Sequence, residues 1–196
     1  MTAIQLIAGL GNPGNKYEQT RHNAGFWFVE AVARKYGAQF RSESKYKSDV
    51  ARCEIHGHEC RLQKPMDFMN RSGPPVASLA GYYRIPRQAI LVVHDDLDLP
   101  PGTVRLKRGG GHGGHNGLRD LIPSLGGNDF MRLRIGIGHP GHRDDVTGHV
   151  LKPASREDRM AIDSAIDAAL KALPEIITGK TDKAMKELHT ADTDKK

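Results

Sequence analysis

The chain has 196 residues, of which 38% are hydrophobic and 27% charged, and it carries a formal net charge of +6 at pH 7. This length is enough for one domain with a sizeable core, and the balance of apolar and charged residues is typical of soluble globular proteins. No apolar run approaches the roughly 20 residues that a membrane helix needs, and the N-terminus lacks the charged region and cleavage site of a signal peptide. We therefore expect a cytoplasmic protein with no membrane partner, and nothing in the sequence requires more than a monomer.

The first half of the chain predicts strands that alternate with helices. The expected elements are, in order, a strand over residues 4–9, a helix over 23–36, a hairpin of strands over 47–58 and 59–63, and a helix over 74–83. The first strand is short, apolar and ended by glycine. Asn23 begins a helix in which apolar residues such as Phe26 and Val29 recur at helical spacing. Gly57 marks the turn of the hairpin.

The second half continues in the same way. The expected elements are a strand over residues 89–96, a strand over 102–110, a helix over 116–125, a strand over 130–138, and helices over 155–177 and 180–189. A glycine-rich loop over residues 109–114 precedes the first of these helices. In "FMRLRIGIG" we expect Leu133 and Ile135 to face one way, and Arg132 and Arg134 the other. Residues 190–196 predict a disordered tail.

This order of elements predicts the fold class. The chain shows no repeats or long linkers, so we expect residues 1–189 to form a single catalytic α/β domain. The expected architecture is a three-layer sandwich, in which a mixed, largely parallel sheet lies between helices. Ligand sites in such sheets gather at the carboxyl ends of the strands. Three polar clusters meet that condition: residues 9–12, residues 94–98, and the glycine-rich loop that leads to Asn116.

The stretch "GLGNPG" over residues 9–14 matches the G-x-G-x-x-G pattern of dinucleotide-binding turns. In those turns a helix begins inside the motif, so that its backbone N–H groups face a pyrophosphate. Here no apolar period begins before Phe26, Pro13 removes one N–H, and no acidic residue follows at a second strand end about 20 residues later. The sequence therefore disfavours a dinucleotide site and favours a rigid turn that presents the amide of Asn12.

Histidine and aspartate residues suggest acid–base chemistry. His22 stands just before a predicted helix, and Asp95 follows a buried strand, which suits a histidine base whose tautomer a carboxylate fixes. No G-x-S-x-G motif supplies a nucleophile, so in a hydrolase water is the expected nucleophile. Three carboxamides, those of Asn12, Asn70 and Asn116, are the expected donors to a developing oxyanion. The residues alone do not decide between His22 and His115 as the base, because each precedes an asparagine.

Two metal sites are alternatives at this stage. Asp95, Asp96 and Asp98 offer carboxylates to Mg²⁺, as a phosphotransferase requires, although no G-x-x-x-x-G-K-[ST] accompanies them. "CEIHGHEC" offers four zinc ligands, namely Cys53, His56, His58 and Cys60. Its spacing does not match zinc fingers, and a hairpin would direct these side chains to both faces. The two cysteines are otherwise expected to be buried or free.

A basic segment lies between Leu99 and Arg143, with seven cationic side chains and only two acidic ones. The cations are Arg105, Lys107, Arg108, Arg119, Arg132, Arg134 and Arg143. Such a segment is either a solvated face or a surface that follows phosphate groups, because cations near a nucleic acid release its condensed counterions. A non-catalytic RNA-binding module is therefore the second class of function that the sequence allows.

Five motifs in order carry a family resemblance. They are "GLGNPGNKYEQTRHNAG", "KPMDFMNRSG", "HDDLDLPPG", "GGGHGGHNGLRD" and "RLRIGIGHPG". Together they resemble bacterial-type peptidyl-tRNA hydrolase, over about Ile4 to His189 and most specifically as far as Gly141. The resemblance implies cleavage of the ester between a peptide and the 3′-terminal ribose of tRNA, which releases peptide and reusable tRNA without a metal or cofactor. The implied partner is peptidyl-tRNA, bound by its acceptor end and its peptide.

The resemblance also implies a role for individual residues. His22 resembles the general base that activates water, and Asp95 its orienting partner. Asn12 resembles the residue that contacts the peptide and separates N-blocked from unblocked aminoacyl-tRNA. Substrate contacts are implied for Tyr17, Phe68, Met69, Asn70 and Asn116. A clamp for tRNA phosphate is implied for Lys107, Arg134 and Arg143. The resemblance thus favours His22 over His115 as the base.

Overall fold

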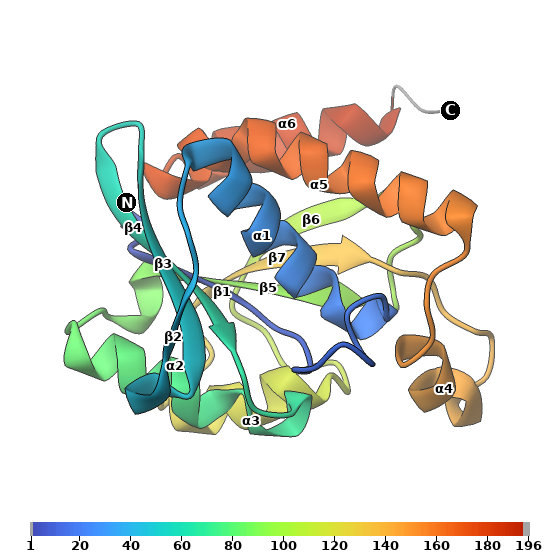
Figure 1. Cartoon of the computed structure of the whole chain (residues 1–196). Helices are drawn as coiled ribbons and strands as arrows, with labels where there is room; N and C mark the ends of the chain where they lie inside the picture. Colours follow the sequence, from blue (N-terminus) through green and yellow to red (C-terminus); the bar gives the residue numbers. More distant parts are fainter. Residues whose placement is uncertain (1, 194–196) are drawn as a thin grey trace.

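The computed structural model describes residues 2–193, which form one seven-stranded sheet with helices on both faces (Figure 1). The strands are β1 (Leu6–Gly9), β2 (Arg41–Glu43), β3 (Ser48–Ile55), β4 (His58–Pro65), β5 (Ile90–Asp96), β6 (Val104–Arg108) and β7 (Met131–Gly136). The α-helices are α1 (Ala24–Tyr36), α2 (Gly73–Tyr82), α3 (Asn116–Ser124), α4 (Val146–Val150), α5 (Arg156–Ile177) and α6 (Thr181–Thr193). Short 3-10 turns are η1 (Arg21–Asn23), η2 (Ser44–Tyr46), η3 (Met69–Arg71), η4 (Arg87–Ala89) and η5 (Arg143–Asp145).

The sheet is mixed and has the strand order β2-β3-β4-β1-β5-β7-β6. Its centre is parallel, since β1 pairs in parallel with β4 and β5, and β5 with β7. Antiparallel pairs form both edges. The predicted α/β class, with a mixed sheet between helical layers, is confirmed. The carboxyl ends of β1 and β5 lie side by side, and this is where a ligand site is expected in such a sheet.

Two apolar layers hold the helices against the sheet. On one face Ile7 and Leu91 join a core with residues of α1, α5 and α6. On the other face Leu6, Ala8 and Val92 join a core with residues of α2 and α3. Full burial of each large apolar side chain contributes roughly 1.5–3 kcal/mol. No helix in the described part of the chain is long and apolar enough to cross a membrane.

The turn after β1 uses its glycines for close packing. A Cβ added at Gly9 would lie 2.3 Å from the carbonyl oxygen of Gly25, and one at Gly11 would lie 2.7 Å from the ring of Phe26. The glycines therefore let β1 approach α1 closely. Helix α1 begins only at Ala24, well after the motif has ended. This arrangement differs from a dinucleotide turn, in which the helix begins inside the motif.

Some elements differ from the sequence prediction. Strand β2 was not predicted, because its three residues are all exposed and show no apolar alternation. Helix α4 was not predicted either, because it has five residues and only Val150 is buried. Helix α6 continues to Thr193, past the expected end at His189, so the tail predicted from residue 190 begins inside a helix. Residues 194–196 of that tail lie outside the described residues. The other elements agree within a few residues at their ends.

Candidate active site

A cleft of about 950 Å³ lies at the carboxyl ends of β1 and β5. The turn after β1, η3, the glycine-rich loop before α3, and α4 contribute to its lining. The structure brings together in this cleft every residue for which the family resemblance implies a catalytic or substrate-binding role. These are Asn12, Tyr17, His22, Phe68, Met69, Asn70, Asp95, Lys107, Asn116, Arg134 and Arg143. Their individual roles stay predictions, and the contacts described below show what each side chain can do.

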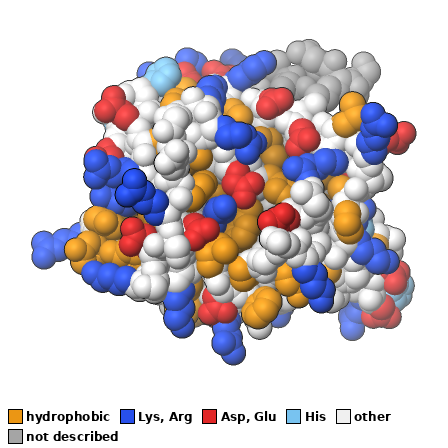
Figure 2. Space-filling view, viewed as in Figure 1, with side chains coloured by type: hydrophobic (Ala, Val, Ile, Leu, Met, Phe, Trp, Pro, Cys, Tyr) orange, Lys and Arg blue, Asp and Glu red, His pale blue; other side chains and the backbone are white. Residues whose placement is uncertain are grey.

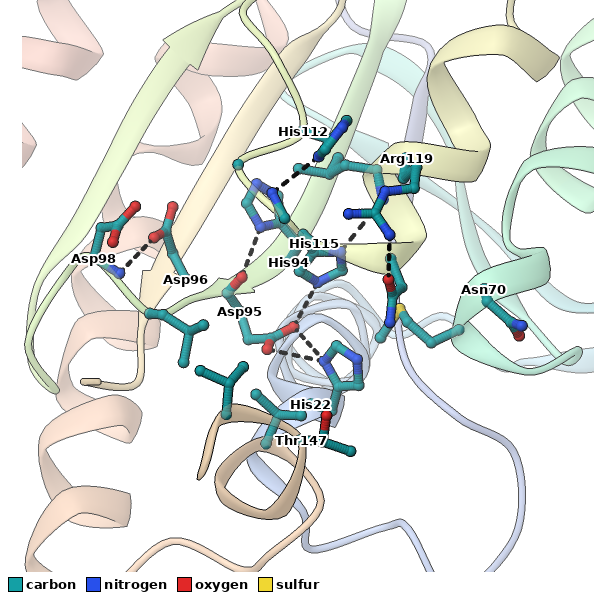
Figure 3. Close-up of a pocket in the computed structure, with 18 of the residues that line it drawn as sticks. His22, Asn70, His94, Asp95, Asp96, Asp98, His112, His115, Arg119 and Thr147 are labelled. Atoms are coloured by element: carbon teal, nitrogen blue, oxygen red, sulfur yellow. Dashed lines mark hydrogen bonds and ion pairs between the residues drawn. The ribbon is translucent and has the colours of Figure 1, made fainter. Parts of the chain in front are cut away.

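His22 and Asp95 face each other in the cleft (Figure 3). Nδ1 of His22 lies 2.9 Å from Oδ2 and 3.0 Å from Oδ1 of Asp95. An ionised carboxylate only accepts hydrogen bonds, so Nδ1 carries the proton and Nε2 keeps its lone pair. No hydrogen bond joins this Nε2 to another of the described residues. The ring therefore offers one basic nitrogen to a ligand or a water.

His115 contacts the same carboxylate but has no free lone pair. Its Nε2 lies 2.8 Å from Oδ1 of Asp95. Its Nδ1 caps helix α3, accepting the backbone N–H groups of Gly117 and Leu118 at 3.1 and 3.3 Å. Nδ1 is thus the unprotonated nitrogen, and Nε2 donates to Asp95. Of the two histidines between which the residues alone could not decide, only His22 has a nitrogen available as a base.

Electrostatic interactions keep Asp95 ionised and His22 basic. Burial by itself raises the pKa of Asp95, but the facing rings of His22 and His115 hold that pKa well below its ordinary value. Burial by itself lowers the pKa of His22, but the charge of Asp95 and its hydrogen bond outweigh this effect and raise the pKa above 6.5. A neutral imidazole whose basicity a facing carboxylate raises is suited to take a proton from water.

His94 packs behind these rings as a neutral side chain. It is 3% exposed, and its ring centre lies 5.1 Å from that of His115 in an edge-to-face contact. Its Nδ1 donates to the backbone carbonyl of Asp95 at 2.8 Å, and its Nε2 has no partner among the described residues. Burial, with a smaller contribution from His115, lowers the pKa of His94 to about 4. We therefore regard His94 as a support for the neighbouring rings.

Asn12 is held in a single orientation. Its Oδ1 accepts the backbone N–H of Met69 at 2.7 Å. Its own backbone N–H and carbonyl pair with the side chain of Asn23, at 2.8 and 2.9 Å. Because Oδ1 is already used, Asn12 presents its Nδ2 group, which can only donate. Asn23 was predicted only to begin helix α1, and its side chain instead fixes Asn12. No pattern in the sequence signals this contact, since asparagine is common at helix starts.

Aromatic and amide side chains form further parts of the lining. Phe68 is 53% exposed, and its ring meets that of Tyr17 edge to face at 6.3 Å. Asn70 is exposed on η3, on the side of the cleft away from Asp96 and Asp98 (Figure 3). Oδ1 of Asn116 accepts a hydrogen bond from Arg119 at 3.2 Å, so its NH₂ group remains as a donor. The cleft thus combines apolar walls with amide donors.

The register of β6 and β7 places four cations on one face of the sheet. Lys107 faces Arg132, and Arg105 faces Arg134, in the antiparallel pair of β6 and β7. Nε of Arg134 contacts Oδ2 of Asp96 at 2.7 Å, which fixes one edge of the guanidinium. On the face of the molecule shown in Figure 2, by contrast, Lys and Arg are interspersed with Asp and Glu. The register therefore identifies a cationic sheet face beside the cleft that net charge alone does not locate.

Arg132 fits neither interpretation of the basic segment, a solvated face or a surface that follows phosphate groups, because its side chain is buried. It is 2% exposed, and its Nη groups donate to the backbone carbonyls of Gly110 and Gly111 at 2.6 and 2.5 Å. The glycine-rich loop thus covers this part of the sheet face. Strand alternation in the sequence indicates only the face of the sheet from which a side chain projects. It does not report whether solvent or a loop lies above that face.

Three side chains lie close enough together to bind one metal ion. One ligand atom each from His22, Asp95 and His115 lie within 4.8 Å of one another, and no other such group occurs among the described residues. A metal-bound imidazole normally donates through its second nitrogen. Nδ1 of His115 instead accepts two backbone N–H groups. This cluster is therefore suited to hydrogen bonding with a carboxylate and poorly suited to a metal ion.

The metal sites considered from the sequence do not form among the described residues. Asp95 pairs with His22 and His115, and Asp96 forms an ion pair with Arg134. These carboxylates are therefore not arranged to share a cation with Asp98. Cys53 and Cys60 are free, buried thiols that face each other across β3 and β4. Burial raises the pKa of both thiols, so the thiolate form that binds zinc is disfavoured.

Comparisons with known proteins agree with one another. A family model described as peptidyl-tRNA hydrolase matches residues 6–196. The chain is 55% identical to a peptidyl-tRNA hydrolase of Halorhodospira halophila, covering 95% of this chain and 96% of that relative. It is also 55% identical to one of Pseudomonas paraeruginosa, with coverage of 97% and 98%. The crystal structure of peptidyl-tRNA hydrolase from Acinetobacter baumannii is similar, with a TM-score of 0.93, 51% identity, and coverage of 96% of this chain and 95% of that one.

Proposed function

The chain belongs to the peptidyl-tRNA hydrolase family and hydrolyses peptidyl-tRNA, and on this premise we propose that His22 is its general base and water its nucleophile. One observation carries the proposal. Asp95 holds Nδ1 of His22 and Nε2 of His115, while Nδ1 of His115 is used by helix α3. Nε2 of His22 is then the single nitrogen of these two rings that can accept a proton from water.

The proposed reaction is a direct hydrolysis of the ester. Nε2 of His22 takes a proton from water as the water oxygen bonds to the ester carbonyl carbon. The imidazolium that forms faces the ionised Asp95, which stabilises it. When the tetrahedral intermediate collapses, the bond to the 3′ oxygen of the ribose breaks, and the proton on Nε2 passes to that oxygen. The products are a peptide with a new carboxyl group and tRNA with a free 3′-hydroxyl, and His22 is neutral again.

Carboxamides supply the hydrogen bonds to the substrate in this proposal. The donors are Asn12, Asn70 and Asn116, and one well-placed donor to a developing oxyanion contributes about 3 kcal/mol. Asn12, which presents only N–H groups, donates to a peptide carbonyl, and such carbonyls are common to peptides of any sequence. An N-blocked substrate brings a neutral amide into this place. A free α-amino group is charged and has to be desolvated there, which discriminates against unblocked aminoacyl-tRNA.

Apolar and cationic side chains complete the proposed substrate site. Tyr17, Phe68 and Met69 form the walls around the acceptor end and the peptide. Lys107, Arg134 and Arg143 form the clamp for tRNA phosphate. The shared sheet face of Lys107 and Arg134, and the position of Arg143 in the lining of the same cleft, support this assignment.

The proposal extends to the state of the protein in the cell. Residues 1–189 act as one catalytic domain, since a single cleft holds every residue to which a role is assigned. The protein works as a monomer in the cytoplasm, where translation generates peptidyl-tRNA, and its chemistry needs no metal or cofactor. Sedimentation of the purified protein tests the oligomeric state.

Hydrolysis of diacetyl-lysyl-tRNA tests the mechanism. Wild-type protein is expected to release the blocked amino acid equally well with and without EDTA. The His22→Ala variant is expected to lose about 10²–10⁴-fold in turnover and to keep its affinity for tRNA, while His58→Ala, on the distant hairpin, serves as the matched control. Near-normal turnover by His22→Ala would refute the assigned base. Loss of wild-type activity in EDTA would refute the metal-free reaction.

A further inference from the structure

The guanidinium of Arg132 is buried, and among residues 2–193 it has backbone carbonyls and no carboxylate as hydrogen-bond partners. The residue is 2% exposed, and its Cζ lies 4.6 Å from the ring centre of Phe130. Its Nη groups donate to the backbone carbonyls of Gly110, Gly111 and Asn128, at 2.6, 2.5 and 3.4 Å, and its Nε has no partner among the described residues. Burying a charge that no opposite charge offsets is costly. The hydrogen bonds of Arg132 therefore have to offset this cost, and they do so by holding the glycine-rich loop.

The two glycine carbonyls belong to the loop that leads to His115. Gly110 has a φ of 99°, a conformation that side-chain-bearing residues rarely adopt. Beyond Gly111 the loop closes into a turn, in which Gly114 N–H donates to Nδ1 of His112, and His115 N–H donates to the carbonyl of His112, both at 2.9 Å. Arg132 thus fixes one end of a short hydrogen-bonded segment, and His115 stands at its other end.

His115 transmits this constraint to the base. It caps helix α3 through Nδ1 and contacts Asp95 through Nε2 at 2.8 Å, while Asp95 orients His22. We propose that Arg132 is a positioning residue for hydrolysis: it fixes the glycine-rich loop so that His115 stays against Asp95. The inference rests on the roles proposed above for Asp95 and His22, because without them the position of His115 has no effect on the reaction.

The planar fork of arginine explains why this residue type suits the position. Two Nη donors reach two successive carbonyls at once, whereas the ammonium of lysine is a point charge that cannot reproduce the fork. Arg132→Lys therefore keeps the positive charge and loses the paired hydrogen bonds, and Arg132→Met loses both. Arg34→Met removes one charge from the exposed end of α1 and serves as the control for net charge.

The experiment measures kcat, KM and the pH dependence of kcat/KM with diacetyl-lysyl-tRNA, on variants that circular dichroism shows to be folded at 25 °C. Arg132→Lys is expected to lower kcat at least tenfold and to change KM less than threefold. The variant is also expected to move the acidic limb of the kcat/KM profile to higher pH. His115 then no longer donates a hydrogen bond to Asp95, so the carboxylate interacts more strongly with His22 and raises the pKa of that ring further. Arg132→Met shows the same kcat loss, and Arg34→Met stays within twofold of wild type.

If Arg132 had a purely structural role, its replacement would lower stability and leave the acidic limb of the kcat/KM profile at the wild-type pH. An acidic limb at the wild-type pH in a folded Arg132→Lys variant therefore overturns the inference. If both Arg132 variants fail to fold, nitrogen NMR of the wild-type protein decides. Separate, slowly exchanging Nη signals of Arg132 at 25 °C are then expected, and freely rotating Nη groups overturn the inference. Turnover by His22→Ala distinguishes the two proposals: if that variant is active, the proposed base fails, and if it is inactive while Arg132→Lys is normal, only the inference about Arg132 fails.

Discussion

Asp95 accepts a hydrogen bond from Nδ1 of His22 at 2.9 Å, and this contact both fixes the tautomer of the ring and raises its pKa. The base works only in its neutral form, so kcat/KM is expected to rise with pH through the raised pKa of His22 and to level off above it. Asp95→Asn removes the charge that raises this pKa, while the burial that lowers it remains. We expect the acidic limb to move to lower pH and the plateau to fall by about 10²-fold or more.

Asp98→Asn is the matched control for this measurement, because it removes a carboxylate from the same strand end. The side chain of Asp98 is exposed, and only its backbone N–H takes part in the hydrogen bond to Asp96. Its pH–rate profile is expected to follow that of wild type. A profile of Asp95→Asn that coincides with wild type would show that Asp95 does not tune the base.

Asn23 is expected to control substrate binding without touching substrate, because its side chain holds both backbone polar groups of Asn12. Asn23→Asp keeps the acceptor and the size but loses the Nδ2 donor, so the carboxylate and the Asn12 carbonyl repel each other in a buried place. A buried acceptor left unpaired costs about 1–3 kcal/mol. We expect a loss of that size in the free energy of urea unfolding, together with at least a tenfold loss of kcat/KM. Unchanged kinetics in a destabilised variant would reduce Asn23 to a structural role.

The sequence predicted the parts of this site that depend on local pattern. His22, Asp95 and Asn12 all follow or precede recognisable strand and helix signals, and parallel strands bring such ends to one edge of the sheet. Arg132 and Asn23 could not be assigned in the same way. The alternation around Arg132 is the same whether solvent or a loop covers that face. The asparagine at residue 23 looks like a helix start until its partner Asn12 is known.

The choice between His22 and His115 as the base is a second distinction that the sequence pattern could not make. Both histidines precede an asparagine, and local pattern does not distinguish them. The difference is the use of Nδ1 of His115 by the N–H groups of helix α3, which depends on where the helix begins to within one residue. Helix ends are the least certain feature of a sequence prediction, so this distinction requires coordinates.

The cationic sheet face is expected to set the salt dependence of tRNA binding. Each lost phosphate contact lowers the slope of log K against log salt concentration by about 0.9 on a duplex. The double variant Lys107→Ala/Arg134→Ala should therefore bind tRNA more weakly, with a slope reduced by about 1–2. Arg34→Ala/Lys35→Ala, at the exposed end of α1, removes the same charge and should keep the wild-type slope. Equal slopes for wild type and the first double variant would place the clamp elsewhere.

His94 is expected to make the protein less stable in mild acid. Its pKa is about 4 in the folded protein against an ordinary value of 6.5, so between these values the unfolded chain binds more protons and the free energy of unfolding falls as pH falls. The shift corresponds to about 3 kcal/mol at most. Asp95 contributes in a separate window, because its lowered pKa costs stability only below pH 3.8. His22, whose pKa is raised, loses its contribution only as pH rises above 6.5.

Urea unfolding of wild type and His94→Gln at pH 4.5 and pH 6.5 isolates this effect. Glutamine keeps an N–H donor for the carbonyl of Asp95 and does not titrate. Wild type is expected to lose about 2 kcal/mol more than the variant between the two pH values. The pH ranges in which His22 and Asp95 change stability lie outside pH 4.5–6.5. An equal loss of unfolding free energy in both proteins would therefore mean that His94 binds a proton as readily in the folded protein as in the unfolded chain, and that it packs against His115 as a cation.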